Sequence, residues 1–413
     1  MNRNIIENHK EYRPLLHFSA PKAWLNDPNG LIYDGENYHL FYQHYPFDIV
    51  PGPMHWGHSM SKDLIHWENK EIALYPTEKG VIFSGSAVID HRNTAQFGTG
   101  AMVVMFTFHQ EVKENGEARI IQSQGIAYSL DGGNSFVHYD KNPVLTYDNP
   151  DFRDPKVFWH EESTKWIAIL VAGNKAMLYN SDNLKDWNFL SEFVAPNSET
   201  DGLWECPDLL QVQVEGSDEK KWVLIVSAST KDHERYGMQY FIGEFDGTRF
   251  INETHREDIL FLDFTFDNYA AVTYEGVKDR SLMVGWMNCW HYGRTIPAKT
   301  FRGAMTIPRE IMIYKEKGVF RLKQSLIREV HEQSELVSKD LNIQEISLST
   351  SPLLIDMELD RVDNEILLSN SKHHIKIKVD VEQSKILIDR RGCGNESMGS
   401  AFYREYQDEY QYA

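Results

Sequence analysis

Short apolar runs separated by turn-forming residues dominate the first 310 residues of the chain. Each run holds about 5–8 aliphatic, β-branched or aromatic residues and is bounded by Gly, Asn, Asp or Pro. No long segment in this part places apolar residues at helical spacing. The pattern therefore predicts short β-strands and argues against a barrel of alternating strands and helices. Representative runs are residues 38–43, 101–106, 165–170, 221–226 and 281–286.

A weak internal repeat narrows the fold further. Residues 61–67 (SKDLIHW) return as 181–187 (SDNLKDW), and residues 129–136 and 245–250 are looser copies. Each copy follows an apolar strand and ends in an aromatic residue, as a β-turn before an outer strand would. The copies start 52 to 68 residues apart, close to one four-stranded propeller blade, so about 300 residues give roughly five blades. A large β-sandwich that reuses one turn is the alternative.

The pattern changes after residue 310. Residues 321–332 predict a short linking helix, and the alternating segments 353–359, 374–379 and 385–389 then predict strands of a small β-sandwich. Because this second domain is too short to close its own core, the sequence leaves a homo-oligomer formed through it open. The expected all-β organisation is an N-terminal tail (1–14), a five-bladed β-propeller (15–314), a linker (315–337) and a shortened β-sandwich (338–413).

Charge and cysteine content limit the function. The chain has 61 Asp and Glu against 42 Lys and Arg, a formal net charge of −19. Such a surface repels phosphate backbones and anionic lipid, so we expect no nucleic-acid and no membrane partner. The three scattered cysteines fit neither a disulfide framework nor a CxxC metal site. The first residues lack the apolar core of a signal peptide, and a cytoplasmic location is expected.

Three carboxylates stand out because each lies within two residues of a proline. They are Asp27 in WLNDPNG, Asp154 in FRDPK and Glu205 in WECPD. Proline keeps the preceding residue out of helical geometry and removes a backbone donor, which suits the exposed inner strand of a blade. The acids are 127 and 51 residues apart, and the inner strands of a propeller converge on one axial pocket. A single Asp-Pro is usually only a turn, but the three together predict an active site.

The motifs around these acids occur in a fixed order along the chain. They are NDPN (26–29), FSG (83–85), RDP (153–155) and ECP (205–207), followed by GWMN (285–288) and RGAM (302–305). This order resembles glycoside hydrolase family 32, which holds invertases, sucrose-6-phosphate hydrolases, levanases and inulinases. The resemblance covers roughly residues 15–312 and implies a five-bladed propeller joined to a β-sandwich. It also implies a retaining β-fructofuranosidase that cleaves sucrose or short fructans through a covalent fructosyl-enzyme intermediate.

The resemblance also implies a role for each acid. Asp27 would attack the anomeric carbon of fructose, and Glu205 would protonate the leaving oxygen and later activate water. Asp154 would hold ring hydroxyls and stabilise the transition state. Retention requires the nucleophile and the acid about 5–5.5 Å apart, and two acids that close do not both ionise easily near neutral pH. Arg153 is expected to keep the adjacent Asp154 ionised.

Aromatic and polar residues in or near the motifs are the candidate substrate contacts. Aromatic rings pack on the apolar faces of a sugar, and neutral amides and hydroxyls bind its hydroxyl groups. The candidates are Trp24, Asn26, Gln43, Trp56, Phe83, Ser84, Arg153, Asp267 and Trp290. No cofactor is expected. No metal is expected either, because His55 and His58 lie in a strand-like segment and no EF-hand loop is present.

The sequence departs from the family pattern at one position, and two other functions remain open. Pro51 stands where many family members carry a tryptophan that shapes the pocket, so leaving-group specificity is open. An inverting propeller glycosidase acting on arabinan or xylan is one alternative, and it would hold its acid and base about 6.5–9.5 Å apart. A carbohydrate-binding propeller without catalysis is the other, although the intact acids argue against it. The expected partner is a small sugar, sucrose or a fructo-oligosaccharide.

Overall fold

Nearly all regular structure in this chain is β-sheet, which confirms the predicted all-β fold class. The computed structural model describes residues 12–114, 116–195, 202–229, 236–255, 259–263, 265–336, 352–355, 364–383, 385–394 and 398–409. Within these ranges the helical elements are α2 (Arg328–Glu332), η1 (Gly293–Thr295) and η2 (Arg391–Cys393). None of the described helices is long and apolar enough to cross a membrane.

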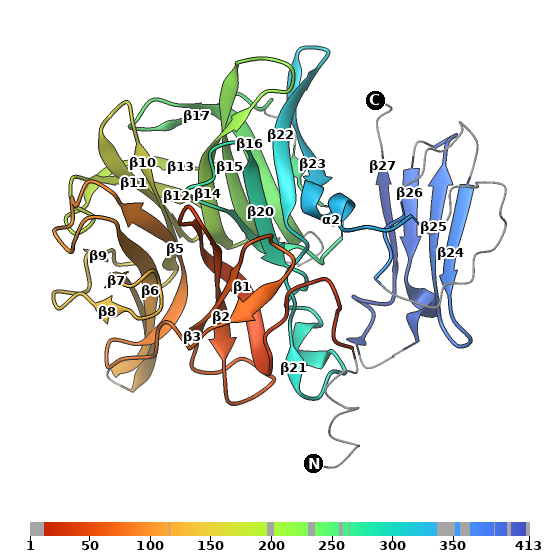
Figure 1. The fold of residues 1–413 in the computed structure, drawn as a ribbon, viewed down its shortest axis with the longest axis horizontal. Helices are drawn as coiled ribbons and strands as arrows, with labels where there is room; N and C mark the ends of the chain where they lie inside the picture. The colour runs from red at the N-terminus through yellow and green to blue at the C-terminus, as the bar shows by residue number, and fades with distance from the viewer. Residues whose placement is uncertain are drawn as a thin grey trace.

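Five sheets follow one another along the chain, each an antiparallel meander of four main strands (Figure 1). The first holds β1 (Ala23–Tyr33), β2 (Tyr38–Tyr45), β3 (His55–Ser61) and β4 (Trp67–Asn69), with β21 (Phe301–Arg302) parallel to β1. The second holds β5 (Val81–Asp90), β6 (Ala101–Glu114), β7 (Glu117–Ser129) and β8 (Val137–His138), with β9 (Leu145–Thr146) on β7. The third holds β10 (Phe152–His160), β11 (Lys165–Ala172), β12 (Ala176–Ser181) and β13 (Asn188–Phe193).

The fourth and fifth sheets complete this series. The fourth holds β14 (Trp204–Gln213), β15 (Lys220–Ser229), β16 (Tyr236–Phe245) and β17 (Phe250–Asn252), with β18 (Leu260–Phe261) on β16. The fifth holds β19 (Tyr269–Thr273), β20 (Ser281–Trp286), β22 (Arg309–Glu316) and β23 (Val319–Leu326). The first strands of the five sheets contact one another in a ring, since β1 meets β5, β5 meets β10, β10 meets β14, β14 meets β19, and β19 meets β1.

The continuous apolar runs of the sequence form the second strand of each sheet. Residues 38–43, 101–106, 165–170, 221–226 and 281–286 lie in β2, β6, β11, β15 and β20. A second strand has a paired neighbour on each side and protein over both faces, so nearly every side chain is buried. In β11 all residues from Trp166 to Ala172 are buried. These strand predictions are confirmed.

The repeated segment forms the turn between the third and fourth strands. Ser61 ends β3, and its hydroxyl accepts a hydrogen bond from the Leu64 N–H at 2.8 Å. Leu64 and Leu184 hold the left-handed conformation in the two clear copies, at φ 65° and 62°. Gly133 and Gly247 hold it in the two looser copies, at φ 82° and 85°. The predicted turn before an outer strand is thus confirmed in four of the five sheets.

A sixth sheet stands beside the other five (Figure 1). It holds β24 (Asn364–Ser369), β25 (His374–Asp380), β26 (Lys385–Asp389) and β27 (Glu405–Glu409) in antiparallel order. The strands predicted at 374–379 and 385–389 are confirmed. Most of the tail predicted at 1–14 and of the strand predicted at 353–359 lies outside the described residues.

The helix predicted at 321–332 is wrong in its first half. Strand β23 continues to Leu326, paired with β22 along its length, and α2 begins only at Arg328. The reason is the alternation of the sequence: Phe320 and Leu322 pack against the core between the fourth and fifth sheets, while Lys323 faces out. The fifth sheet therefore extends beyond the boundary predicted at residue 314.

Candidate active site

Each first strand has an irregularity near its start, where the motif residues lie, and β1 has a second one between Asn29 and Ile32. The register with the second strand shifts within residues 25–28, 82–85, 153–156, 205–208 and 269–272. Three residues in these bulges have left-handed backbone: Asp154 (φ 62°), Cys206 (φ 46°) and Ala270 (φ 54°). A bulge re-aims side chains and tolerates a residue that cannot donate, which suits Pro155 and Pro207. The five bulges bring side chains from distant segments together.

Cys206 lies between two of the three predicted acids. Its Sγ is 3.7 Å from Asp27 Oδ2 and 3.6 Å from Asp154 Oδ2. The two carboxylates therefore lie on either side of one thiol. The Cys206 backbone N–H also donates to Asp154 Oδ2 at 2.9 Å. Burial raises the pKa of the Cys206 thiol well above its usual value, so the thiol stays protonated beside both acids.

Arg153 joins the third acid to the group. Its Nη2 lies 3.4 Å from Glu205 Oε1, and its Nε lies 3.8 Å from Asp154 Oδ2. Tyr269 donates its hydroxyl to Glu205 Oε2 at 2.5 Å. Burial and the Glu205 charge raise the pKa of Tyr269, so the phenol remains a donor. The structure thus brings Asp27, Asp154 and Glu205 together from β1, β10 and β14.

Asp27 is held by two neutral donors. Ser84 donates to Asp27 Oδ2 at 2.7 Å, and Asn26 Nδ2 donates to Asp27 Oδ1 at 2.9 Å. Asp27 and Glu205 are partly exposed, whereas Asp154 is only 6% exposed. The pKa of Asp27 is raised, first because the surrounding protein excludes water and then because the charge of Glu205 is close. The two acids open to solvent are therefore electrostatically coupled.

Asp154 differs from the expectation that Arg153 keeps it ionised. Arg153 does lower the pKa of Asp154, but burial acts more strongly and raises that pKa to about 7. The nearby charge of Glu205 raises the pKa further in the same direction. Sequence adjacency reveals the arginine but not the depth of burial, and a buried carboxylate loses more from lost hydration than one neighbouring cation returns.

The predicted aromatic contacts divide into two kinds. Trp24 and Trp56 are fully buried at 0% exposure, so they support the pocket from behind and offer no surface to a sugar. Trp56 Nε1 donates to the carbonyl of Phe83 at 3.0 Å, and Trp24 stacks on Trp290 with ring centroids 6.0 Å apart. Phe83 and Trp290 themselves are partly exposed. Only these last two can form a wall that a ligand touches.

The predicted amide contacts also act behind the acids. Both ends of the Asn26 amide are used, because Asn26 Oδ1 accepts from Trp24 Nε1 at 2.7 Å while its nitrogen holds Asp27. Gln43 is buried and donates to Asn29 Oδ1 at 2.9 Å. These residues fix the bulge of β1 and thereby the direction of the Asp27 carboxylate.

Asp267 lies apart from this group. It accepts hydrogen bonds from the Tyr292 hydroxyl and from Arg390, which follows β26 of the sixth sheet. The Arg390 guanidinium also lies 4.3 Å from the ring centroid of Phe402. Within the described residues Asp267 makes no hydrogen bond to the three acids. Its contacts are those of a residue that joins the sixth sheet to the rest of the chain.

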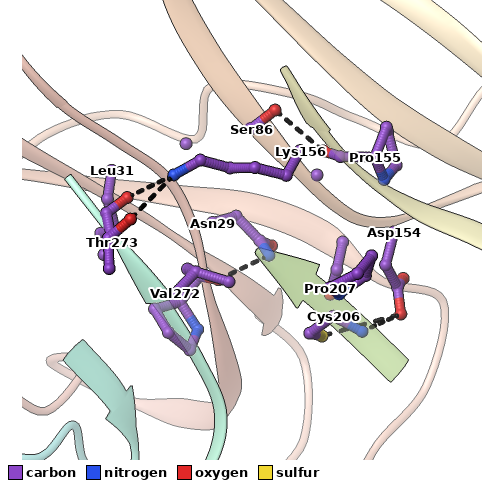
Figure 2. Close-up of a pocket in the computed structure, with 14 residues that line it drawn as sticks. Asn29, Leu31, Ser86, Asp154, Pro155, Lys156, Cys206, Pro207, Val272 and Thr273 are labelled. Atoms are coloured by element: carbon purple, nitrogen blue, oxygen red, sulfur yellow. Dashed lines mark hydrogen bonds between the residues drawn. The ribbon is translucent and has the colours of Figure 1, made fainter. Parts of the chain in front are cut away.

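A small pocket lies among the first strands, lined by Asp154, Cys206 and Lys156 among others. In Figure 2 the Lys156 side chain reaches toward Thr273, while Asp154 and Cys206 lie together on the other side. Lys156 Nζ donates to the Thr273 carbonyl at 2.7 Å and lies 3.3 Å from Asp208 Oδ2 and 3.4 Å from Glu275 Oε1. This buried cation connects β10, β14 and β19, two of which carry acids.

The sequence interpretation overlooked two residues that contact the acids. Tyr269 lies in the DNYA segment, two residues after the predicted contact Asp267, and Cys206 lies inside the ECP motif. The repeated bulge could have indicated Tyr269, because the first strand of the fifth sheet also has a bulge and therefore also directs side chains toward the acids.

The described residues contain no group of three or more His, Cys, Asp or Glu side chains that could hold a metal ion.

The site holds two partly exposed carboxylates, a buried third and an arginine between them. A pair of carboxyl groups at one site is typical of a glycoside hydrolase. Comparison with known families agrees, since residues 17–324 match the glycosyl hydrolases family 32 N-terminal domain. The chain belongs to glycoside hydrolase family 32, as the motifs suggested.

Similar proteins carry related activities in their names. A levanase of Bacillus subtilis is 39% identical over 95% of this chain, and an extracellular exo-inulinase of Aspergillus niger is 41% identical over 73% of it. This chain covers 60% and 62% of those two relatives, so it spans about three fifths of their length. An invertase of Debaryomyces hansenii is 34% identical over 95% of this chain and 76% of its own length.

Solved structures agree on the fold. A fructofuranosidase of Schwanniomyces occidentalis complexed with fructosylnystose superimposes with a TM-score of 0.85 at 30% identity, covering 98% of this chain and 85% of that one. An exo-inulinase of Aspergillus awamori superimposes with a TM-score of 0.81 at 31% identity, covering 97% of this chain and 87% of that one.

Proposed function

We propose that this chain is a retaining β-fructofuranosidase that hydrolyses terminal β-fructofuranosyl units of sucrose or short fructans. The observation that carries the proposal is the convergence of Asp27 and Glu205, both partly exposed, on one site. Cys206 Sγ contacts Asp27 and Asp154 at 3.7 and 3.6 Å, and Arg153 lies 3.8 Å from Asp154 and 3.4 Å from Glu205. A fructosyl group passes through an oxocarbenium-like state, which needs a carboxylate on one face and an acid on the other. The names of the relatives, levanase, exo-inulinase and invertase, support fructosides as substrates.

The proposed reaction has two steps. In the first, Asp27 forms a bond to the anomeric carbon while the bond to the leaving oxygen breaks and Glu205 gives that oxygen its proton. In the second, Glu205 takes a proton from water, the water oxygen bonds to the anomeric carbon, and the Asp27 ester breaks. Arg153 and Tyr269 hold the two oxygens of Glu205 through both steps, at 3.4 Å and 2.5 Å. Asp154 binds sugar hydroxyls from its buried position.

The architecture that supports this chemistry is proposed as a closed five-bladed propeller with a partial β-sandwich. The ring of contacts among β1, β5, β10, β14 and β19 supports the propeller, because five inner strands meet around one centre. The sixth sheet, β24 to β27, would be one layer of the sandwich. The exposure of its side chains on both faces fits a layer whose partner layer is lacking from the described residues.

Replacing the two exposed acids tests the function. Glu205→Ala should lower kcat on sucrose by about 10²–10⁴-fold, the usual contribution of a general acid, yet spare a fructoside with a good leaving group. Asp27→Ala should abolish turnover of both, and a trapped fructosyl adduct should map to Asp27 by mass spectrometry. Glu68→Ala, an exposed glutamate in β4 that is 74% exposed, is the control and should behave as wild type.

Two further measurements separate the alternatives. The anomer of the first product, followed by NMR, should match that of the substrate, whereas an inverted product would favour the inverting mechanism. Absence of sugar release from sucrose, sucrose 6-phosphate, inulin and levan would favour a carbohydrate-binding protein. The same panel ranks the natural substrates, since it varies the leaving group while keeping the fructosyl unit.

A further inference from the structure

One face of the β6–β7 hairpin carries an ordered row of polar pairs. Directly opposed residues of two antiparallel strands share a face, and the face recurs at every second residue. Thr107 pairs with Gln124, and His109 pairs with Gln122 two residues farther along β6. Successive pairs are therefore separated by about 7 Å along the strand.

The inner pair of this row contacts the strand that carries Asp154. Thr107 Oγ1 accepts a hydrogen bond from the Asp154 N–H at 3.0 Å and donates to Gln124 Oε1 at 2.7 Å. Gln124 Nε2 donates to the Phe152 carbonyl at 2.8 Å. This face of the hairpin thus lies directly against the start of β10.

Exposure rises along the row, away from Asp154. Thr107 and Gln124 are at 0% exposure, Gln122 is at 5%, and His109 is partly exposed. Ile120, two residues beyond Gln122, is 43% exposed. The row therefore leads from the strand that carries the buried acid toward the surface.

His109 is the partly exposed member of this row, and its ring is fixed on two sides. Its ring stacks on Phe83 with centroids 4.2 Å apart and an interplanar angle of 13°. Phe83 directly precedes Ser84, which holds Asp27. Gln122 Nε2 donates to His109 Nδ1 at 3.0 Å, so the proton of the neutral ring is on Nε2. Burial, and next the charge of Arg153, lower the pKa of His109, which keeps the ring neutral.

We propose that His109, oriented by Gln122 and stacked on Phe83, binds the first sugar unit on the leaving-group side of the bond that is cleaved. The ligand is a neutral polyhydroxyl ring, to which His109 Nε2–H donates a hydrogen bond while Phe83 supplies an apolar surface. This assignment rests on the proposed function, since the acids hold the fructosyl unit and the leaving unit must lie one step farther out.

Varying the leaving group tests the assignment. His109→Ala should lower kcat/KM for sucrose and for a β-linked fructose disaccharide by about tenfold, the worth of one hydrogen bond plus packing. It should change kcat/KM for methyl β-fructofuranoside, whose leaving group has no ring, by less than twofold. His109→Gln keeps a donor and should recover part of the loss. The control is His138→Ala. The His138 ring lies against Phe106 and Phe108 in the same sheet, so this variant should change kcat/KM for neither type of substrate.

Several outcomes would overturn the assignment. Equal losses on both substrate types would place His109 in the support of the acids, and unchanged kinetics on all of them would remove it from the site. A weaker inhibition by free fructose in His109→Ala would place it in the fructosyl pocket instead. If the wild-type protein released no fructose from any substrate, the proposed function would fail. The subsite would then be judged by whether His109→Ala weakens binding of the fructose disaccharide relative to fructose, measured by calorimetry.

Discussion

The five-sheet body and the sixth sheet are built from the same antiparallel pairing, yet they bury their side chains very differently. Ile169 in β11 is paired on both sides, to Lys156 and Leu178, and is 0% exposed. Ile377 in β25 is also paired on both sides but remains partly exposed. Hydrogen bonding thus gives a strand its neighbours, while burial needs a second layer packed on its faces.

Charges follow the same division. The body buries Lys156 with Asp208 and so keeps an ion pair away from water. The sixth sheet keeps its pairs at the surface, as with Lys376 and Glu365, which are 41% and 51% exposed. In the body, burial raises the pKa of Asp27 and Asp154, the direction that keeps an acid protonated, whereas in the sixth sheet an ion pair with Arg391 lowers the pKa of Asp389.

The largest expected difference between the two regions is the effect of removing a lysine. Lys156→Met should reduce the free energy of unfolding by about 3–5 kcal/mol, because it leaves buried carboxylates without their cation. Lys376→Met should change it by less than about 1 kcal/mol, as for exposed pairs in general. Urea unfolding of the two variants measures both values. Equal effects would mean that the buried cation contributes no more than a surface charge, and Lys156→Met/Asp208→Asn should recover part of the loss.

A matched pair of isoleucines gives a smaller contrast. Ile169→Ala should cost about 2–5 kcal/mol, since it opens a cavity in a closed core. Ile377→Ala should cost less than half as much, because its side chain is already partly in water. Hydrogen exchange of β15 and β25 in each variant would show which region is loosened. Loss of protection in β15 on Ile377→Ala would contradict the separation of the two regions.

The sequence was most informative where burial is continuous. Second strands such as β11 are covered on both faces, so their composition alone predicted them. The acids were also predicted, because each stands within two residues of a proline in an aromatic or charged setting. Residues 321–326 were predicted as helix because a short run with both polar and apolar residues fits a strand as well as a helix. Only its packing against the core between the fourth and fifth sheets decides.

Features that depend on neighbouring strands could not be predicted. The left-handed backbone of Asp154, Cys206 and Ala270 comes from bulges, and it is uncommon for residues other than glycine. The full burial of Trp56 depends on packing with Phe41 and Phe106 from other strands. Motifs thus indicate which residues lie near the site, while the surrounding strands decide whether each side chain is buried or exposed.

The smallest expected difference between the two regions is in how their carboxylates make stability depend on pH. The folded pKa of Asp154 is about 7, raised by burial above a normal value near 4. The folded state therefore binds more protons than the unfolded chain between these values, and stability falls as pH rises through this window. Asp154→Asn should remove that loss. Its free energy of unfolding should therefore rise relative to wild type by roughly 1–3 kcal/mol between pH 5 and pH 8.

Asp389 in the sixth sheet is the matched control for this measurement. Arg391 holds the pKa of Asp389 at about 2, so the carboxylate is ionised in both the folded and unfolded states over this pH range. Asp389→Asn should therefore leave the slope of stability against pH unchanged. Thermal unfolding of both variants from pH 5 to 8 gives the comparison. Parallel slopes for Asp154→Asn and wild type would show that Asp154 is already ionised in the folded protein, with Arg153 outweighing its burial.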